Sequence, residues 1–360
     1  MLEIACFHLY NDYSGSPKVL RNVIEGLLGK GHKVNVVTSD TKGVLDEFCG
    51  NNNIQYDYFN YSLSENKICW TLCLLWAQVC LFFKALKYRR CSVFYINTIL
   101  PIGAALAGKL LNKKIVYHYH ENAFIKSTYY RFLCRIMLSI ADEIICVSKY
   151  QRAFLPEYDN ISVVYNALPK SFTCQLTPNI DNAYNNKNVL MVSSLLLYKG
   201  PMEFITLATI LSQYNFTLVL NETQESIDRF LKNNRIEVPE NIRIYPRQSD
   251  VSLFYNAASV LLNLSDRNKI IETFGMTVLE GMSAGLPVIV PTVGGIAELV
   301  EDGKNGYKID VAHLDVIADK ISYMFECYDI YKQLAEGALS TASLYSSEQM
   351  CEGIENILKR

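Results

Sequence analysis

The stretch Ser259–Gly306 reads SVLLNLSDRNKIIETFGMTVLEGMSAGLPVIVPTVGGIAELVEDGKNG, and it predicts a strand, a polar loop and a helix in that order. The helix opens at Gly275, where the absence of a side chain lets the backbone come close to a ligand. The first amides of a helix have no partners and lie at the positive end of its dipole. The amides of Gly275, Met276 and Thr277 therefore predict an anion site that suits a diphosphate.

Two carboxylates flank this helix start. Glu280 lies about one and a half turns inside the helix, where it can accept hydrogen bonds from paired ribose hydroxyls. Glu272 precedes the helix, where it can hold a sugar hydroxyl and stabilise positive charge at an anomeric carbon. The spacing alone leaves an alternative open, in which Glu272 only complements the helix dipole and Glu280 is an exposed helix charge.

Apolar runs rich in Val, Ile and Tyr alternate with helix-length segments along the whole chain, which predicts an α/β fold with parallel sheets. Strands are expected at 2–9, 33–39, 92–97, 114–120, 143–148 and 162–165, and again at 189–193, 216–220, 242–245, 260–264, 287–291 and 307–310. The first helix is expected over 17–30.

The polar, turn-prone run 170–187 is expected to be a linker between two domains. Residues 1–169 and 188–345 would then form two Rossmann-like, doubly wound domains that face each other. Ligands of such sheets bind at the carboxyl ends of the strands, which predicts a site in the cleft between the domains. Residues 346–360 predict a last helix that can cross back to the first domain.

Composition narrows the class of protein. The 360 residues carry a net charge of −2 without a long single-sign run, which predicts no nucleic-acid partner because phosphate binding needs a basic face. The 11 cysteines form no CxxC pair and fit neither a metal site nor a disulfide framework, which favours a reducing cytoplasm. The amino terminus resembles a first strand and not a signal peptide, since no basic segment precedes its apolar residues.

Residues 69–90 have two interpretations. The run 69–83 is apolar except for Thr71 and Gln78, and four basic residues follow it. Its 15 residues are short for a membrane span, which needs about 20. The segment is either a buried crossover helix or an interfacial helix on the inner leaflet, with Trp70 and Trp76 at headgroup level.

Four motifs in order resemble the C-terminal signature of the GT-B-fold retaining glycosyltransferases called family 4. They are Glu-x-Phe-Gly-x-x-x-x-Glu at 272–280, Gly-x-Pro-Val at 285–288, Gly-Gly-x-x-Glu at 294–298 and Asp-Gly-x-x-Gly at 302–306. Ser14-Gly15-Ser16, Gly31-His32-x-Val and His120-Glu121 are similar to elements of the family's first domain. The resemblance covers nearly the whole chain.

The resemblance implies a nucleotide-sugar donor bound mainly by the C-terminal domain, an acceptor bound mainly by the N-terminal domain, and transfer with retention. It implies no cofactor and no metal, and the absence of an Asp-x-Asp motif agrees. The implied catalytic residues are Glu272, His120 and Lys199, and Gly15, Asn97 and His120 lie on the acceptor side. The implied donor-binding residues are Ser194, Lys199, Arg247, Thr273, Phe274, Gly275, Met276, Thr277 and Glu280.

One departure concerns the leaving phosphate. Ser194 stands where the family has an arginine, so one bidentate phosphate contact is lost, and Arg267 or Lys269 can supply the missing charge. Two roles also stay open for His120, which is either a ligand contact or a strand-end histidine satisfied by backbone. Arg247 likewise has two possible roles: it either lies beside the base of the donor nucleotide or is a solvated side chain in a loop.

We therefore expect an enzyme that moves a sugar from a UDP- or GDP-sugar to a glycan in bacterial surface polysaccharide biosynthesis (capsule, O-antigen or exopolysaccharide). The apolar and basic segments 69–90 and 129–135 favour a lipid-linked acceptor and peripheral contact with the inner membrane face. The alternative is a degenerate protein of this fold that binds nucleotide sugar or scaffolds a polysaccharide assembly complex without catalysis. A dehydrogenase is disfavoured because no G-x-G-x-x-G follows the first strand.

Overall fold

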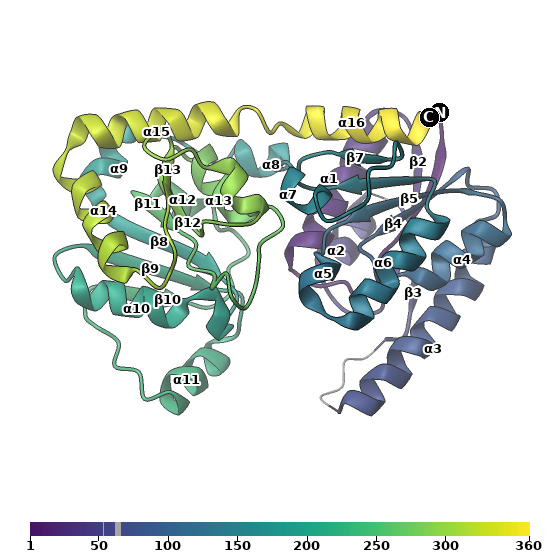
Figure 1. Ribbon diagram of the computed structural model, residues 1–360, viewed down its shortest axis with the longest axis horizontal. Helices are drawn as coiled ribbons and strands as arrows, with labels where there is room; N and C mark the ends of the chain where they lie inside the picture. The colour runs from purple at the N-terminus through teal and green to yellow at the C-terminus, as the bar shows by residue number, and fades with distance from the viewer. Residues whose placement is uncertain (53, 62–65) are drawn as a thin grey trace. The chain divides into compact units, whose positions relative to one another are not determined.

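The computed structural model describes residues 1–52, 54–61 and 66–360. These residues divide into two compact units, one made of 1–167 with 347–360 and the other of 168–346 (Figure 1). Each unit is built on one parallel sheet with crossover helices, so the predicted α/β class and its doubly wound order are confirmed.

The first unit has a seven-stranded sheet of order β3-β2-β1-β4-β5-β6-β7 among its described residues. Its strands are β1 (Glu3–Phe7), β2 (Lys33–Ser39), β3 (Gln55–Phe59), β4 (Val93–Asn97), β5 (Lys114–Tyr119), β6 (Glu143–Cys146) and β7 (Ile161–Val163). Its helices are α1 (Gly15–Gly29), α2 (Val44–Asn51), α3 (Lys67–Ala85), η1 (Leu86–Tyr88), α4 (Ile102–Leu110), α5 (Ala123–Lys126), α6 (Thr128–Ile140), α7 (Lys149–Arg152) and α16 (Ser347–Lys359).

The second unit has a six-stranded sheet of order β10-β9-β8-β11-β12-β13. Its strands are β8 (Asn188–Ser193), β9 (Asn215–Leu220), β10 (Ile242–Tyr245), β11 (Val260–Leu262), β12 (Val288–Val290) and β13 (Gly306–Lys308). Its helices are α8 (Lys170–Thr173), α9 (Ile180–Asn186), η2 (Leu197–Lys199), α10 (Pro201–Ile210), α11 (Gln224–Asn233), α12 (Ser252–Asn256), α13 (Met276–Ser283), η3 (Gly295–Leu299), α14 (Leu314–Glu326) and α15 (Tyr328–Ala342).

The run 170–187, expected as a linker, carries the short helices α8 and α9 and belongs to the second unit. One of its polar residues is a helix cap and not part of a flexible turn. Asn179 Oδ1 accepts a hydrogen bond from the amide of Asn182 at 3.0 Å, as an N-cap does. Asn179 thus begins α9 as its N-cap.

The last helix, α16, lies beside α1 in the first unit (Figure 1). Its buried face is apolar, with Ile354 and Ile357 at 0% and 2% exposure. At the edge of this face Glu355 accepts hydrogen bonds from Lys30 Nζ at 2.8 Å and His32 Nε2 at 2.9 Å. Apolar burial and this charged cluster together attach the end of the chain to the first unit.

Helix α3 is longer than the apolar run that predicted it, and it runs along α4 (Figure 1). One face is part of the core, with Leu74, Ala77 and Leu81 no more than 3% exposed. The stretch Cys69–Tyr88 is long and apolar enough to cross a membrane, and only 22% of its most apolar part is buried within the protein. The segment therefore has one face buried, as expected of a crossover helix, and one apolar face exposed.

Candidate active site

The carboxyl ends of β8, β9 and β10 lie side by side because these strands are neighbours in the parallel sheet. Ser194 follows β8 directly and is half-buried. Asn221, which follows β9, donates from its amide to the carbonyl of Ser193 at 2.9 Å. Arg247, two residues past β10, donates from Nε to Asn221 Oδ1 at 2.8 Å. The expected donor residues Ser194 and Arg247 thus share one edge of the sheet.

A lysine and a glutamate from two loops form an ion pair at this edge. The ammonium of Lys199, at the end of η2, donates to Oε1 of Glu272, in the loop that leads to α13. The buried hydroxyl of Ser265 donates to the same oxygen at 3.1 Å. About a fifth of each charged side chain is exposed, 19% for Lys199 and 22% for Glu272. The carboxylate is fixed through one oxygen, and the pair remains accessible to a ligand.

The Gly294-Gly295 motif anchors the backbone of Glu272. Gly294 has a φ of 108°, and a Cβ there would lie 2.6 Å from the carbonyl oxygen of Glu272. The amide of Gly295 donates to that oxygen at 2.9 Å. Glycine is required at 294 both for its backbone angle and for this close approach. The two glycines therefore set the position from which the Glu272 side chain projects.

The turn into α13 also requires glycine. Gly275 has a φ of 102°, and a Cβ there would lie 2.6 Å from Cγ1 of Ile296. Within the described chain, the amides of Gly275, Met276 and Thr277 form no hydrogen bond. They therefore offer three donors at the positive end of the α13 dipole.

Thr273 and Phe274 separate Glu272 from that turn. The Phe274 side chain is 3% exposed, and its ring packs edge-on against Tyr345 with centroids 5.9 Å apart. Its side chain is thus an apolar anchor for the loop, which leaves only its backbone for a ligand. Thr273 is half-buried.

Glu280 has a buried partner that the sequence analysis did not single out. The hydroxyl of Tyr255, on α12, donates to Glu280 Oε2. Burial, together with the adjacent carboxylate of Glu280, raises the pKa of Tyr255 well above its ordinary value. Tyr255 therefore stays protonated and holds the half-buried carboxylate in one orientation.

The two cations proposed to replace the missing arginine are each paired with a carboxylate. Arg267 Nε contacts Asp310, and its guanidinium also donates to the Thr292 hydroxyl at 2.9 Å. Lys269 Nζ lies 3.2 Å from Oδ2 of Asp266, three residues earlier in the same loop. The contacts of Arg267 connect loops of the second unit, whereas the Lys269 pair lies within one loop. Any contribution of Arg267 or Lys269 to an anion site would compete with these pairs.

In the first unit, the expected acceptor-side residues meet at the carboxyl edge of the sheet. Asn97, the last residue of β4, is fully buried. Its Oδ1 lies 2.9 Å from Nε2 of His120, which follows β5, and its Nδ2 lies 3.2 Å from the carbonyl of Ser16. Gly15, which precedes Ser16 at the start of α1, is exposed and has open space where a Cβ would stand.

Two further histidines accompany His120. His8, which follows β1, has Nδ1 3.1 Å from Asn97 Nδ2, and the His118 ring lies 4.2 Å from the His120 ring between centroids. Burial lowers the pKa of His8 to about 4 and that of His118 to about 3. Burial and these two neighbours lower the pKa of His120 well below its ordinary value. The three rings are therefore neutral at neutral pH.

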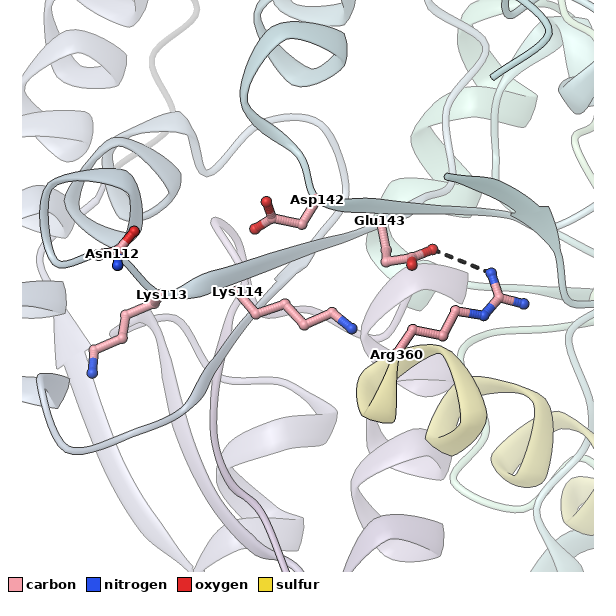
Figure 2. Close-up of a pocket in the computed structure, with 6 residues that line it drawn as sticks. All are labelled: Asn112, Lys113, Lys114, Asp142, Glu143 and Arg360. Carbon is pink, nitrogen blue, oxygen red and sulfur yellow. Dashed lines mark hydrogen bonds and ion pairs between the residues drawn. The ribbon is translucent and has the colours of Figure 1, made fainter. Parts of the chain in front are cut away.

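A hollow of about 350 Å³ lies at the opposite edge of the same sheet, where β5 and β6 begin (Figure 2). Figure 2 shows Lys114, Glu143 and Arg360 converging there. Lys114 Nζ donates to the carbonyl of Ile357 at 2.7 Å, and Arg360 pairs with Glu143 at 3.4 Å. These charges hold the end of α16, so the hollow is a structural joint at the amino ends of the strands, away from His120.

Ser265, Tyr255 and His8 are the contact residues that sequence reasoning missed. Ser265 follows a predicted strand and His8 lies near the carboxyl end of another, and that position is the signal that could have indicated them. Tyr255 carries no such signal, because only the packing of α12 against α13 identifies it. Among the described residues, no three His, Cys, Asp or Glu side chains gather where they could hold a metal ion.

Two sequence families match the chain. The family described as Glycosyltransferase Family 4 matches residues 13–171, and Glycosyl transferases group 1 matches residues 178–341. An uncharacterized glycosyltransferase of Methanocaldococcus jannaschii is 27% identical over 263 residues, 71% of each chain.

Two further similarities are more partial or more remote. The N-acetyl-alpha-D-glucosaminyl L-malate synthase of Bacillus anthracis is 28% identical over 133 residues, 37% of this chain and 33% of the synthase. The crystal structure of Anabaena HepE with UDP and glucose superposes with a TM-score of 0.83 at 18% identity and covers all of both chains. The latter similarity shows the fold.

Proposed function

The chain belongs to the family-4 glycosyltransferases of the GT-B fold, and from this premise we propose that it transfers a sugar from a UDP- or GDP-sugar to a glycan with retention of configuration. The observation that carries the proposal is the Lys199–Glu272 pair. It lies beside a helix start whose first amides are unbonded among the described residues. The crystal structures of HepE with UDP and with UDP-glucose make a uridine nucleotide the first donor to test.

The donor binds in the second unit. Its diphosphate receives hydrogen bonds from the amides of Gly275, Met276 and Thr277, and the Lys199 ammonium offsets the charge of the leaving group. These groups supply positive charge without a divalent metal, so the proposed reaction is metal-independent. Glu280, oriented by Tyr255, accepts hydrogen bonds from the ribose hydroxyls.

Glu272 acts on the sugar. Because Ser265 and Lys199 both bind its Oε1, its other oxygen can accept a sugar hydroxyl without the carboxylate moving. The negative charge there stabilises the positive charge that develops at the anomeric carbon. The departing phosphate oxygen takes the proton of the acceptor hydroxyl on the same face, which gives retention and needs no protein nucleophile.

The acceptor side lies in the first unit and includes Gly15, Asn97 and His120. We propose a lipid-linked glycan acceptor of a bacterial surface polysaccharide pathway and peripheral attachment of a cytoplasmic protein to the inner membrane face. Five large apolar side chains on α3 support this attachment, each between 44% and 64% exposed: Leu72, Leu75, Trp76, Val79 and Phe83. Their spacing places them along one helix face.

Charge around this face favours anionic lipid. Lys84, Lys87, Arg89 and Arg90 follow the last of these apolar residues, and α3 contains neither Asp nor Glu. Each basic side chain near an anionic leaflet contributes about 1 kcal/mol. Because the opposite face of α3 is part of the core, the helix would lie in the interface plane and not span the bilayer.

Vesicle sedimentation tests the attachment. We expect the protein to sediment with vesicles of phosphatidylglycerol and phosphatidylethanolamine and to bind pure phosphatidylcholine weakly. The double variant Trp76→Ser/Phe83→Ser should lose sedimentation. Leu253→Ser, a substitution of a 67% exposed leucine in the second unit, should retain it. Equal sedimentation of the two variants would remove α3 from the proposal.

Donor screening followed by a transfer assay tests the enzyme. A thermal-shift screen of UDP-, GDP-, ADP- and dTDP-sugars should identify one donor class, since a ligand at about 100 times its Kd adds roughly 2.7 kcal/mol of stability. Turnover of that donor should fall at least about 100-fold in Glu272→Gln. If a nucleotide sugar binds but is neither transferred to any tested acceptor nor hydrolysed, the proposed transfer reaction is contradicted.

That last result would instead favour the second candidate, a non-catalytic nucleotide-sugar-binding or scaffold protein. The feature that favours it is Ser194, which provides no charge for the leaving phosphate. A Glu272→Ala strain with full polysaccharide production would support this candidate.

A further inference from the structure

Asn97 is placed to control the hydrogen position of His120. It is fully buried, and its side-chain amide contacts His8, His120 and the backbone of Ser16. The residue after it, Thr98, has a φ of 73°, a left-handed value that a β-branched residue rarely adopts. Backbone contacts hold Thr98 there, with its amide 2.9 Å from the carbonyl of His118. A strained backbone fixed in this way commonly marks a functional position.

The carbonyl of Ser16 determines which way the Asn97 amide faces. A carbonyl oxygen only accepts hydrogen bonds, so the atom 3.2 Å from it must be the amide nitrogen of Asn97. The same nitrogen lies 3.1 Å from Nδ1 of His8. His8 Nδ1 also lies 3.4 Å from the backbone carbonyl of Asn97, to which it would have to donate, so these contacts leave the His8 tautomer open.

The same orientation determines the tautomer of His120. With its nitrogen turned to Ser16, Asn97 presents Oδ1 to Nε2 of His120 at 2.9 Å. An amide oxygen only accepts, so Nε2 of His120 carries the hydrogen. A neutral ring has one N–H, which leaves a lone pair on Nδ1, and Nδ1 has no hydrogen-bond partner among the described residues.

We propose that Asn97 is a positioning residue that fixes His120 as the Nε2–H tautomer, so that Nδ1 of His120 accepts a hydrogen bond from a sugar hydroxyl. The inference rests on the proposed function for the identity of that hydroxyl, whereas the tautomer follows from the contacts alone. A bare lone pair selects a donor group such as a hydroxyl. It repels a carboxylate or phosphate oxygen, which has no hydrogen to give. The low pKa of His120 keeps this preference at neutral pH.

Nuclear magnetic resonance of the full chain labelled with ¹⁵N-histidine reads the tautomers directly. Long-range proton–nitrogen correlations should show an Nε2–H pattern for His120, which is identified by the loss of its signals in His120→Gln. Asn97→Leu should convert His120 to a mixture of tautomers. Asn22→Leu is the matched control, because Asn22 is also buried in the first unit and its Nδ2 binds the carbonyl of Ala167 at 2.9 Å.

Two outcomes would overturn the inference. One is an Nδ1–H or a charged His120 ring in the unmodified protein, and the other is an equal change of the His120 pattern in Asn97→Leu and Asn22→Leu. If no nucleotide sugar is turned over but the Nε2–H pattern is present, the proposed function fails and the tautomer assignment stands.

Paired substitutions test the acceptor role of Nδ1. The side-chain amide of His120→Asn occupies the region of Nδ1, whereas that of His120→Gln reaches the region of Nε2. We expect His120→Asn to retain at least tenfold more kcat/KM for transfer than His120→Gln. The reverse order would show that the ligand contacts Nε2 and would overturn the assignment of Nδ1.

Discussion

Lys199 and Glu272 are 73 residues apart in the sequence and form an ion pair at the carboxyl edge of the second sheet. The pairing explains how a lysine can stand in the proposed diphosphate site before any ligand binds. In the proposed function its ammonium, which has three hydrogens to donate, also binds the phosphate when a donor arrives, while Lys199 and Ser265 keep their bonds to the same carboxylate oxygen.

Lys199→Ala should therefore reduce kcat more than it changes the donor KM, because its charge matters most as the diphosphate leaves. We expect a loss of about 100-fold or more, and Lys199→Arg should recover part of it because it keeps the charge. Steady-state kinetics with the donor found by screening measures both values. Arg229→Ala, which removes an exposed i,i+4 pair with Glu225, should match the unmodified enzyme. A loss confined to KM would show that Lys199 only binds the donor.

Tyr255→Phe should weaken donor binding with little change in kcat. The substitution removes a buried hydroxyl that donates to Glu280, a charge-assisted hydrogen bond of about 1.5–3 kcal/mol. This bond is already present in the free protein, so only its effect on the orientation of Glu280 changes donor affinity; we expect roughly a tenfold rise in Kd, about 1.4 kcal/mol, which isothermal titration can resolve. Tyr331→Phe is the control, since it removes an equally buried hydroxyl that donates to the carbonyl of Ser259 at 2.8 Å. Equal affinity of the two variants would contradict the role of Tyr255.

Glu355→Gln should destabilise the first unit in a pH-dependent way. Hydrogen bonds from Lys30, Lys359 and His32 lower the pKa of Glu355 from 4.5 to about 2. A carboxyl whose pKa is lower in the folded state stabilises the protein above its unfolded pKa and loses that contribution as pH falls toward the folded one. The difference from the unmodified protein should be about 1–2 kcal/mol at pH 7 and shrink below about pH 4.5.

Urea unfolding followed by helix circular dichroism at several pH values measures this difference. Glu352→Gln, an exposed position on the same helix, should show no such dependence. A pH-independent difference for Glu355→Gln would mean that shape and not charge explains the effect.

Strand positions were predictable because both sheets are parallel and their buried strands read as continuous apolar runs. The strands β8 to β13 match the expected ranges to within two residues at each end. β3 (Gln55–Phe59) was not expected, because it is the half-exposed edge strand and lacks that apolar continuity. The sequence also could not show which face of α3 is buried, because an apolar side chain that faces solvent has the same sequence pattern as one that faces the core.

The site was predictable as a set of strand ends and a helix start, but not as a set of partners. Tyr255 and Glu280 meet only because α12 and α13 pack in the same unit, and Lys199 meets Glu272 only because β8 is the neighbour of β11. The position of Glu272 depends further on the two glycines at 294 and 295. Predicting such pairs requires the order of the strands in the sheet, which composition and periodicity do not reveal.

Gly15→Ala separates a structural from a functional glycine at the start of α1. A Cβ at 15 meets no atom within 4 Å, and the backbone there has no positive φ, so the unfolding free energy should change by less than about 0.5 kcal/mol. Because Gly15 is exposed and next to Ser16, whose carbonyl binds Asn97, the new methyl group would instead meet an approaching ligand. We expect kcat/KM for transfer to fall at least tenfold.

Gly29→Ala provides the control at the opposite end of the same helix, since Gly29 has equally open surroundings and should keep both stability and activity. Full activity of Gly15→Ala with unchanged stability would remove Gly15 from the proposed acceptor side, because no steric or backbone cost would then distinguish the two ends of α1.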